Sequence, residues 1–117
     1  MVKTISVVLL KETLEKSKRG VLIDVRTTEE YEHLHAPEVK SVIEHTEMAK
    51  SLNRLPADKS TPIYLICRSG NRSGKVARVL MDAGYSEVFN VAGGMLAWLE
   101  HGYPVETGRG ILDTHNT

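Results

Sequence analysis

A buried strand, a polar loop and a helix follow one another in residues 63–83, IYLICRSGNRSGKVARVLMDA. The run 63–67 is short and apolar, which is typical of a strand that is buried on both faces. After Ser73, apolar side chains recur at helical spacing and predict the buried face of a helix. They are Val76, Val79, Leu80 and Ala83. Gly84 comes next, where a helix often ends in a left-handed residue, so the end of this helix is well marked.

The same alternation of apolar runs and helical patterns continues on both sides of this unit. Two further apolar runs, 21–25 and 88–91, predict buried strands, while 5–8 and 41–43 predict edge strands. Helical patterns lie between them, at residues 10–18, 28–33, 46–53 and 95–101. Strands that alternate with helices pair in parallel through right-handed crossovers. The sequence therefore predicts an α/β fold with a central, mostly parallel sheet of about five strands and helices on both faces.

The composition indicates one domain without a strong net charge. The chain has 117 residues, the usual size of one compact domain, and 41% of them are hydrophobic. We expect a single domain over residues 1–105 and a loosely held tail over 106–117, where apolar residues are few. Because 15 basic and 15 acidic residues give a formal net charge of zero, no global field would draw the chain to nucleic acid or to an anionic membrane.

Cysteine usage and hydropathy bear on the compartment. The sequence has one cysteine, Cys67, which cannot form a disulfide within the chain and fits a reducing environment. The short apolar run near the amino terminus is followed by Lys11 and Glu12 and shows no cleavage site for a signal peptidase. No run approaches the roughly 18 apolar residues of a membrane span. We therefore expect a soluble, cytoplasmic protein.

Cys67 stands at the carboxyl end of a predicted strand, directly before the polar loop 68–72. In parallel α/β sheets, ligands bind beyond the carboxyl ends of strands, where the next helix presents free N–H groups. Gly70 can adopt positive φ and curl the loop amides toward one centre, and Arg68 and Arg72 add positive charge. These features favour a thiolate with a pKa of roughly 3.5 to 7.5, against about 8.5 for a free cysteine. The alternative is a small buried residue without chemistry.

The whole loop, Cys67-Arg68-Ser69-Gly70-Asn71-Arg72-Ser73, resembles the active-site loop of the rhodanese family of sulfurtransferases. The similarity extends to residues 22–26 before the loop, and to Gly93-Gly94 and residues 102–105 after it. The resemblance implies a rhodanese-like fold in which Cys67 is the catalytic nucleophile and carries sulfur as a persulfide. It also implies a set of substrate-binding residues. They are Arg68, Ser69, Gly70, Asn71, Arg72 and Ser73.

The same resemblance implies the partners of the reaction. The donor is a small sulfur-bearing anion such as thiosulfate, and the acceptor is a thiol or cyanide. Arg68 and Arg72 can hold the anionic donor while loop amides stabilise the persulfide. This scheme needs no metal and no organic cofactor.

Other functions stay open at this point. One is a sulfur-carrying or redox adaptor that acts on a partner protein. Another is phosphatase or arsenate reductase chemistry, but that uses five residues between cysteine and arginine, whereas four separate Cys67 from Arg72. The tighter loop suits one sulfur atom better than a phosphoryl group, whose three outer oxygens all need donors. Arg72 also has a structural alternative, because a buried arginine needs a carboxylate partner.

Two residues near the end of another strand are predicted to support the site. We expect Asp24 to bind loop amides or to pair with an arginine, because a thiolate attack that releases sulfite needs no strong acid. Arg26 and Glu30 are spaced for an ion pair near the start of the helix at 28–33 and are predicted to belong to the scaffold.

One segment departs from the family pattern. Where rhodaneses commonly read Gly-His-Ile-Pro-Gly-Ala, this sequence has Leu34-His35-Ala36-Pro37-Glu38-Val39. By analogy, the segment lies beside the cysteine loop. We expect Leu34 and Val39 to reshape the rim of the pocket, and Glu38 to repel a dianionic donor.

The remaining distinctive residues are interpreted as structural. Glu32, His33 and His35 form the densest cluster of metal-ligand types, but no ligand set is complete, so the histidines are taken as solvated or hydrogen-bonded. Met95 and Trp98 are predicted core residues. Gly93-Gly94 is expected to make a strand-to-helix turn that borders the pocket.

Overall fold

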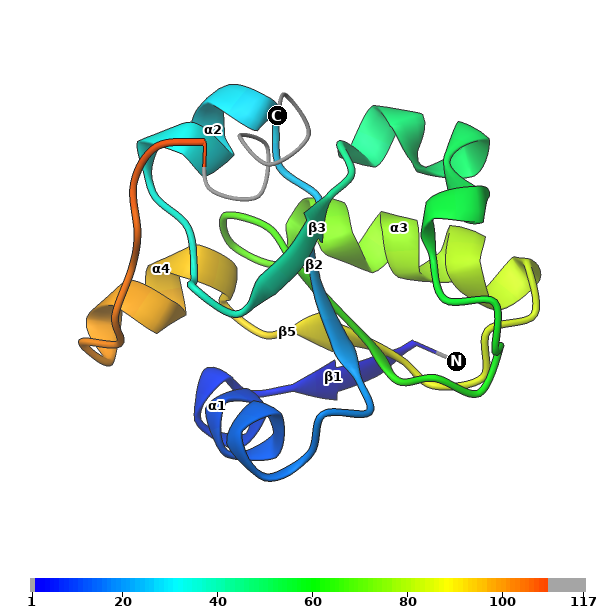
Figure 1. Ribbon diagram of the computed structural model, residues 1–117, viewed down its shortest axis with the longest axis horizontal. Coiled ribbons are helices and arrows are strands. Elements are labelled where there is room, and N and C mark those ends of the chain that lie inside the picture. Colours follow the sequence, from blue (N-terminus) through cyan, green and yellow to red (C-terminus); the bar gives the residue numbers. More distant parts are fainter. Residues whose placement is uncertain (1, 110–117) are drawn as a thin grey trace.

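The computed structural model describes residues 2–109 and shows a five-stranded parallel sheet between helices (Figure 1). The strands are β1 (Lys3–Ile5), β2 (Val21–Asp24), β3 (Val39–Val42), β4 (Ile63–Ile66) and β5 (Val88–Val91). The helices are α1 (Val7–Lys16), α2 (Thr28–His33), α3 (Asn71–Asp82) and α4 (Gly94–Glu100), with two 3-10 helices, η1 (His45–Lys50) and η2 (Leu52–Arg54). The strand order is β1-β5-β4-β2-β3, and each neighbouring pair is parallel. The predicted α/β fold is confirmed, with β1 and β3 as the edges.

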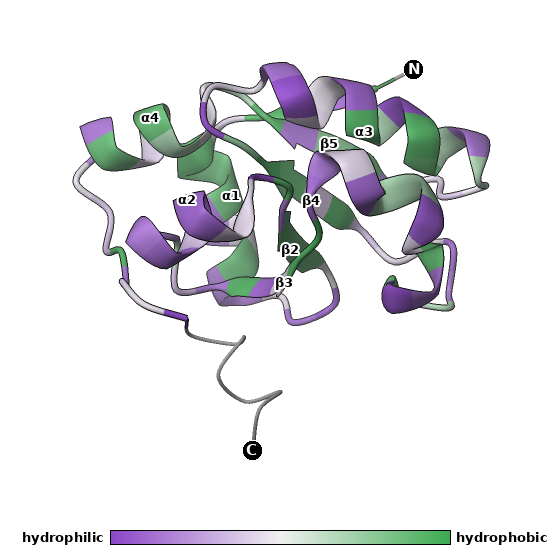
Figure 2. Cartoon of the chain, turned by 90° about the horizontal axis from the view of Figure 1, so that it is seen from above, coloured by the Kyte–Doolittle hydropathy of each residue, from purple (hydrophilic) through white to green (hydrophobic). Residues whose placement is uncertain are grey.

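Alternate residues of the central strand β4 point to opposite faces of the sheet and divide the core in two. Tyr64 packs on one side with residues of α1 and α4, including Trp98. Leu65 packs on the other side with residues of α3, including Leu80. In Figure 2, β2 is green where it lies inside the molecule, whereas α2 is mostly purple. Helices cover both faces of the sheet, as the sequence predicts.

A side-chain cap sets the start of α1. The Ser6 hydroxyl accepts a hydrogen bond from the N–H of Leu9, so the helix begins at Val7. The prediction of a strand at 5–8 and of a helix from residue 10 is wrong at this boundary. A capping serine inside a continuous apolar run ends the strand and starts the helix earlier than the apolar pattern alone indicates.

The buried face of α3 shares Val76 and Leu80 with the predicted stripe but is rotated toward Ser73 and Ala77. Its buried residues are Ser73, Val76, Ala77 and Leu80. Val79, predicted to be buried, is 37% exposed. Ser73 therefore lies on the core side of the first turn, close to the end of β4. Gly84 has a φ of 101° and ends the helix region as predicted, whereas residues 46–53 form the 3-10 helices rather than an α-helix.

After α4 the chain runs back to the α2 side of the molecule. His35 and Glu106 exchange both backbone hydrogen bonds at 2.9 Å, and the N–H of Gly108 donates to a carbonyl at the end of α2 at 2.7 Å. Of the predicted tail, Glu106 and Gly108 have these contacts, and residues 110–117 lie outside the described residues. Within the part of the chain that the structure describes, no helix is long and apolar enough to cross a membrane.

Candidate active site

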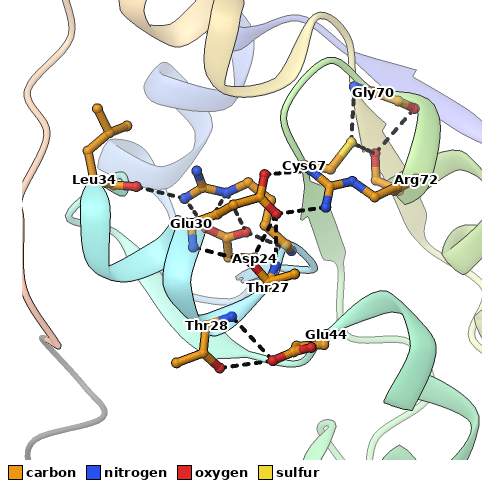
Figure 3. Close-up of polar contacts among 11 residues, drawn as sticks. Asp24, Thr27, Thr28, Glu30, Leu34, Glu44, Cys67, Gly70 and Arg72 are labelled. Carbon is orange, nitrogen blue, oxygen red and sulfur yellow. Dashed lines mark hydrogen bonds and ion pairs between the residues drawn. The ribbon is translucent and has the colours of Figure 1, made fainter.

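Cys67 follows β4, and its sulfur faces the loop that leads into α3 (Figure 3). The N–H of Gly70 donates to Sγ at 3.0 Å. The Ser73 hydroxyl lies 3.3 Å from the same sulfur. Because Cys67 is only 1% exposed, these contacts are screened little by water. The sulfur is therefore buried, but it is buried among hydrogen-bond donors.

The loop is held in shape by Asn90, a polar residue in the otherwise apolar strand β5. Its Nδ2–H donates to the Gly70 carbonyl at 3.0 Å, and its Oδ1 accepts from the Ser73 hydroxyl. Gly70 has a φ of 102°, which a residue with a Cβ rarely adopts. We call Cys67, Gly70, Ser73 and Asn90 the sulfur cradle. Asn90 was not predicted from the sequence, although a lone amide side chain within an apolar strand was a usable signal.

Opposing effects set the ionisation of Cys67. Burial raises the pKa of the thiol, but hydrogen bonds from the Ser73 hydroxyl and from the amides of Ser73, Gly70 and Ser69 outweigh it and hold the pKa below its ordinary value. A thiolate accepts a stronger hydrogen bond than a neutral amide oxygen, so ionisation draws the Ser73 proton from Asn90 toward the sulfur. The predicted direction is confirmed, but neutral donors rather than the two arginines are the main cause.

The start of α4 holds the backbone of Cys67 and Arg68 through hydrogen bonds. The N–H groups of Met95 and Leu96 donate to the carbonyls of Cys67 and Arg68 at 2.8 and 3.0 Å. Gly94 has a φ of 53°, and a Cβ on it would lie 2.3 Å from the Cys67 carbonyl oxygen. The predicted Gly93-Gly94 turn is confirmed, and it fixes the backbone on which the thiol is carried.

Arg72 is held by a carboxylate. Its Nη1 and Nη2 donate to the two oxygens of Glu30 at 2.8 and 2.9 Å. Glu30 also completes a capping box with Thr27 at the start of α2. The Arg72 guanidinium is the main cause that lowers the pKa of Glu30 to about 2. This geometry ties α3 to α2 and supports the structural alternative for Arg72.

Arg26 pairs with Asp24 rather than with Glu30. Its Nη2 lies 2.6 Å from Asp24 Oδ2, and its backbone N–H donates to Asp24 Oδ1 at 3.0 Å. The same Nη2 donates to the Leu34 carbonyl at 2.8 Å. The predicted Arg26–Glu30 pair is wrong. Arg26 precedes α2 and its side chain turns back to Asp24 at the end of β2, whereas Glu30 forms its ion pair with Arg72. The expected pairing of Asp24 with an arginine is confirmed, and both partners are buried.

Arg68 differs from the other two arginines. It is exposed, and its side chain has no hydrogen bond or ion pair with the described residues 2–109. It lines a groove of about 460 Å³ between α2 and α4, which we call the α2–α4 groove. Apolar side chains make up much of its wall. They are Leu34, Met95, Leu96 and Leu99. Of the other predicted binding residues, Ser69 and Asn71 are both exposed.

The segment that departs from the family pattern is only partly at the rim. Leu34 lines the α2–α4 groove, as expected. Val39 pairs with Leu22 near the amino end of β2 and is buried, and Glu38 forms an ion pair with Lys11 of α1 at 2.9 Å. The expectations that Val39 reshapes the rim and that Glu38 repels a dianionic donor there are therefore wrong. The chain crosses from the carboxyl edge of the sheet to the amino edge before β3 begins.

The histidine cluster is not a metal site in the described part of the chain. No group of three or more His, Cys, Asp or Glu side chains gathers there in a way that could hold a metal ion. His35 stacks on Tyr31 with ring centroids 3.7 Å apart, and its Nδ1 lies 2.7 Å from the Tyr31 carbonyl. Met95 and Trp98 are buried in the core, as predicted.

The sequence is similar to those of known proteins. The family described as the Rhodanese-like domain matches residues 6–101. A sulfurtransferase of Allochromatium vinosum is 33% identical over 110 residues, covering 94% of this chain and 100% of that protein. The thiosulfate sulfurtransferase GlpE of Pseudomonas syringae is 33% identical, covering 81% of this chain and 86% of that protein.

Solved structures agree with the sequence comparison. The crystal structure of a rhodanese-like domain protein from Staphylococcus aureus superimposes with a TM-score of 0.75 and 35% identity, covering 83% of this chain and 91% of that one. The family match covers most of the described residues, and the relatives and the common fold agree with it. The chain belongs to the rhodanese-like domain family.

Proposed function

We propose that the chain is a sulfurtransferase that carries sulfane sulfur as a persulfide on Cys67. The observation that supports this most is the sulfur cradle, in which Gly70 N–H and the Ser73 hydroxyl lie 3.0 and 3.3 Å from Sγ. Donors that already lie around a buried sulfur stabilise an anion there, with only the Ser73 hydroxyl proton turning from Asn90 to the sulfur. The names of the relatives, a sulfurtransferase and a thiosulfate sulfurtransferase, agree with this assignment.

The reaction consists of two displacements on sulfur. In the first, the Cys67 thiolate attacks the outer sulfur of thiosulfate, a new S–S bond forms, and the S–S bond of the donor breaks. Sulfite leaves with the electron pair. In the second, the carbon of cyanide or the sulfur of a thiol attacks the outer sulfur of the persulfide, and the Cys67 thiolate is restored. No proton donor is needed at the leaving group, which agrees with the structural role of Asp24.

The anionic donor is bound by Arg68 in this scheme. Arg72 is paired with Glu30, so its charge is largely neutralised. Arg68 is exposed and next to Cys67, and its fork of N–H groups suits the oxygens of a sulfonate. The same geometry argues against phosphoryl transfer, because that chemistry needs a guanidinium beside the thiolate and Arg72 is engaged elsewhere.

Thiocyanate formation tests this function directly. We expect the protein to convert thiosulfate and cyanide to sulfite and thiocyanate, and to gain the mass of one sulfur atom when treated with thiosulfate alone. Cys67→Ser removes both results. A wild-type protein whose intact mass stays unchanged after exposure to thiosulfate would contradict the proposal.

A sulfur carrier that delivers to a partner protein is the second candidate. The observation in its favour is that a relative from Bacillus subtilis, 37% identical over 94 residues, is named as a putative sulfur carrier protein. A carrier forms the Cys67 persulfide quickly and turns over slowly with cyanide until an acceptor protein is added. Fast multiple turnover with small molecules alone excludes this candidate.

A further inference from the structure

The α2–α4 groove is larger than the donor and acceptor of the thiocyanate assay require. Its volume of about 460 Å³ falls in the range of sites that hold medium-sized organic ligands. The sulfur of Cys67 needs only a small anion in front of it. The groove therefore offers room for a part of a substrate that takes no part in the chemistry.

The groove adjoins the loop that follows Cys67. Arg68 follows Cys67 in the chain, and Met95, on the groove wall, donates its N–H to the Cys67 carbonyl at 2.8 Å. Glu30, also on the wall, binds Arg72 of the loop. A molecule in the groove thus lies next to the loop that carries the reacting sulfur.

The wall on the α4 side is apolar and open to solvent. Leu96 and Leu99 are 43% and 42% exposed, and Leu34 faces them from the end of α2. Leu96 and Leu99 together leave an apolar surface of α4 open at the groove. An apolar chain laid against them would be removed from water on one side.

Two of the charged side chains that line the groove are already paired with opposite charges. Arg26 is paired with Asp24, and Glu30 is paired with Arg72. Glu29, at the α2 side, is exposed to solvent, which screens its charge. Arg68 is the cation beside Cys67 that has no side-chain partner among residues 2–109. A ligand anion placed next to the reacting sulfur would complement it.

We propose that the physiological acceptor is a thiol with an apolar chain and an anionic group next to the sulfhydryl. The anionic group pairs with Arg68, and the apolar chain lies in the α2–α4 groove against Leu34, Leu96 and Leu99. This proposal rests on the proposed function. The acceptor thiolate attacks the outer sulfur of the Cys67 persulfide, the bond from that sulfur to Sγ breaks, and the products are the acceptor persulfide and the Cys67 thiolate.

Two acceptors that differ only in the length of the chain test the proposal. α-Mercaptopropionate and α-mercaptooctanoate carry the same thiol beside the same carboxylate, and the second has five more methylenes. With thiosulfate as donor, sulfite release gives kcat/KM for each acid. Burial of part of the longer chain should make kcat/KM for the octanoate about ten to a hundred times higher. Equal values in the wild type would overturn the proposal.

Variants of the apolar wall locate the preference. In the double variant Leu96→Ser and Leu99→Ser, the ratio of the two kcat/KM values should fall below about three. This ratio does not depend on the active fraction of the sample, so partial unfolding cannot imitate the result. The matched control is Leu9→Ser on α1, which changes a leucine that is 53% exposed and lies outside the groove. If the ratio of the two kcat/KM values stays unchanged in the double variant, or falls equally in the control, the proposal is overturned.

The failure of this proposal and the failure of the proposed function look different. If thiocyanate forms normally but the two acids react alike, only the acceptor assignment falls. If no persulfide forms on Cys67, the proposed function is wrong. Binding of a ligand in the groove is then measured by calorimetric titration with octanoate, which has no thiol. Binding that the double serine variant loses supports the groove as a site, and absence of binding in the wild type overturns it.

Discussion

The sulfur cradle and the α2–α4 groove share one loop, yet their construction is opposite. The cradle is closed, and its Cys67 sulfur meets uncharged donors from Gly70 and Ser73. The groove is open, and it combines exposed leucines with Arg68, whose side chain has no partner among residues 2–109. In a low-dielectric site, fixed neutral donors stabilise an anion without the cost of burying a full positive charge. In the proposed function, ionisation of the sulfur and recognition of the substrate therefore depend on different residues.

Gly94→Ala should break the cradle with the largest effect. The new Cβ would lie 2.3 Å from the Cys67 carbonyl oxygen, at a φ of 53°. Overpacking against backbone together with the strained conformation should lower the free energy of unfolding by about 3 kcal/mol or more. Urea denaturation measures this loss, and thiocyanate formation should fall with it.

Gly102→Ala is the matched control for this change. Gly102 also has a positive φ, 69°, but a Cβ there would meet nothing within 4 Å. Its cost should stay near about 1 kcal/mol from conformation alone. If both alanine variants lose the same stability, the close approach of Gly94 to the cysteine loop has no energetic importance.

Ser73→Ala should weaken the cradle while leaving the groove intact. Loss of the hydroxyl raises the pKa of the Cys67 thiol, because that hydroxyl is the largest of the effects that lower it. Below the pKa of the wild type, kcat/KM for thiosulfate should drop about tenfold, and at high pH the two proteins should converge. Ser86→Ala, at an exposed serine outside the site, is the control. An unchanged pH profile in Ser73→Ala would assign the ionisation to other groups.

Arg68→Ala should affect the groove alone. We expect KM for thiosulfate to rise about tenfold at low ionic strength, with a smaller rise in concentrated salt. The pH dependence of the reaction should stay that of the wild type. Arg78→Ala removes an exposed arginine of α3 outside the groove and is the control. A shift of the pH profile in Arg68→Ala would mean that this arginine belongs electrostatically to the cradle.

Glu30→Gln should have the smallest effect, on the pH dependence of stability. Since the pKa of Glu30 is lowered from 4.5 to about 2, its pair with Arg72 stabilises the fold fully above 4.5 and is lost as the pH falls toward 2. The pair is about 30% exposed, so the contribution should be about 1 kcal/mol or less. Thermal melting at pH 7 and at pH 3 should show a smaller drop in Glu30→Gln than in the control Glu29→Gln. Equal drops would contradict the role of the pair.

Sequence patterns predict those features that depend on neighbours along the chain. The run 88–91 becomes β5 without change, and the helical pattern after Ser73 becomes most of α3. Both elements bury apolar side chains at regular spacing, and that spacing can be read from the sequence alone. The loop that follows Cys67 is predicted for the same reason, because its strand, its glycine and its helix are contiguous.

Contacts across the fold are predicted less well. Arg26 and Glu30 have the spacing of an ion pair, but Arg26 pairs with Asp24 and Glu30 pairs with Arg72. Asn90 approaches Gly70 only because β5 lies beside β4, and no spacing along the chain reveals that contact. Such pairings follow from strand order, which the local pattern does not specify.

Direct titration of the Cys67 thiol tests whether the sulfur cradle lowers the pKa of this cysteine. The rate of alkylation by iodoacetamide, measured across pH on the folded protein, reports the fraction of thiolate. We expect a midpoint below that of a free cysteine, about 8.5, and an upward shift in the Ser73→Ala variant. A midpoint at or above 8.5 in the wild type would mean that burial outweighs the donors, and the sulfur cradle would then have no role in activating the cysteine.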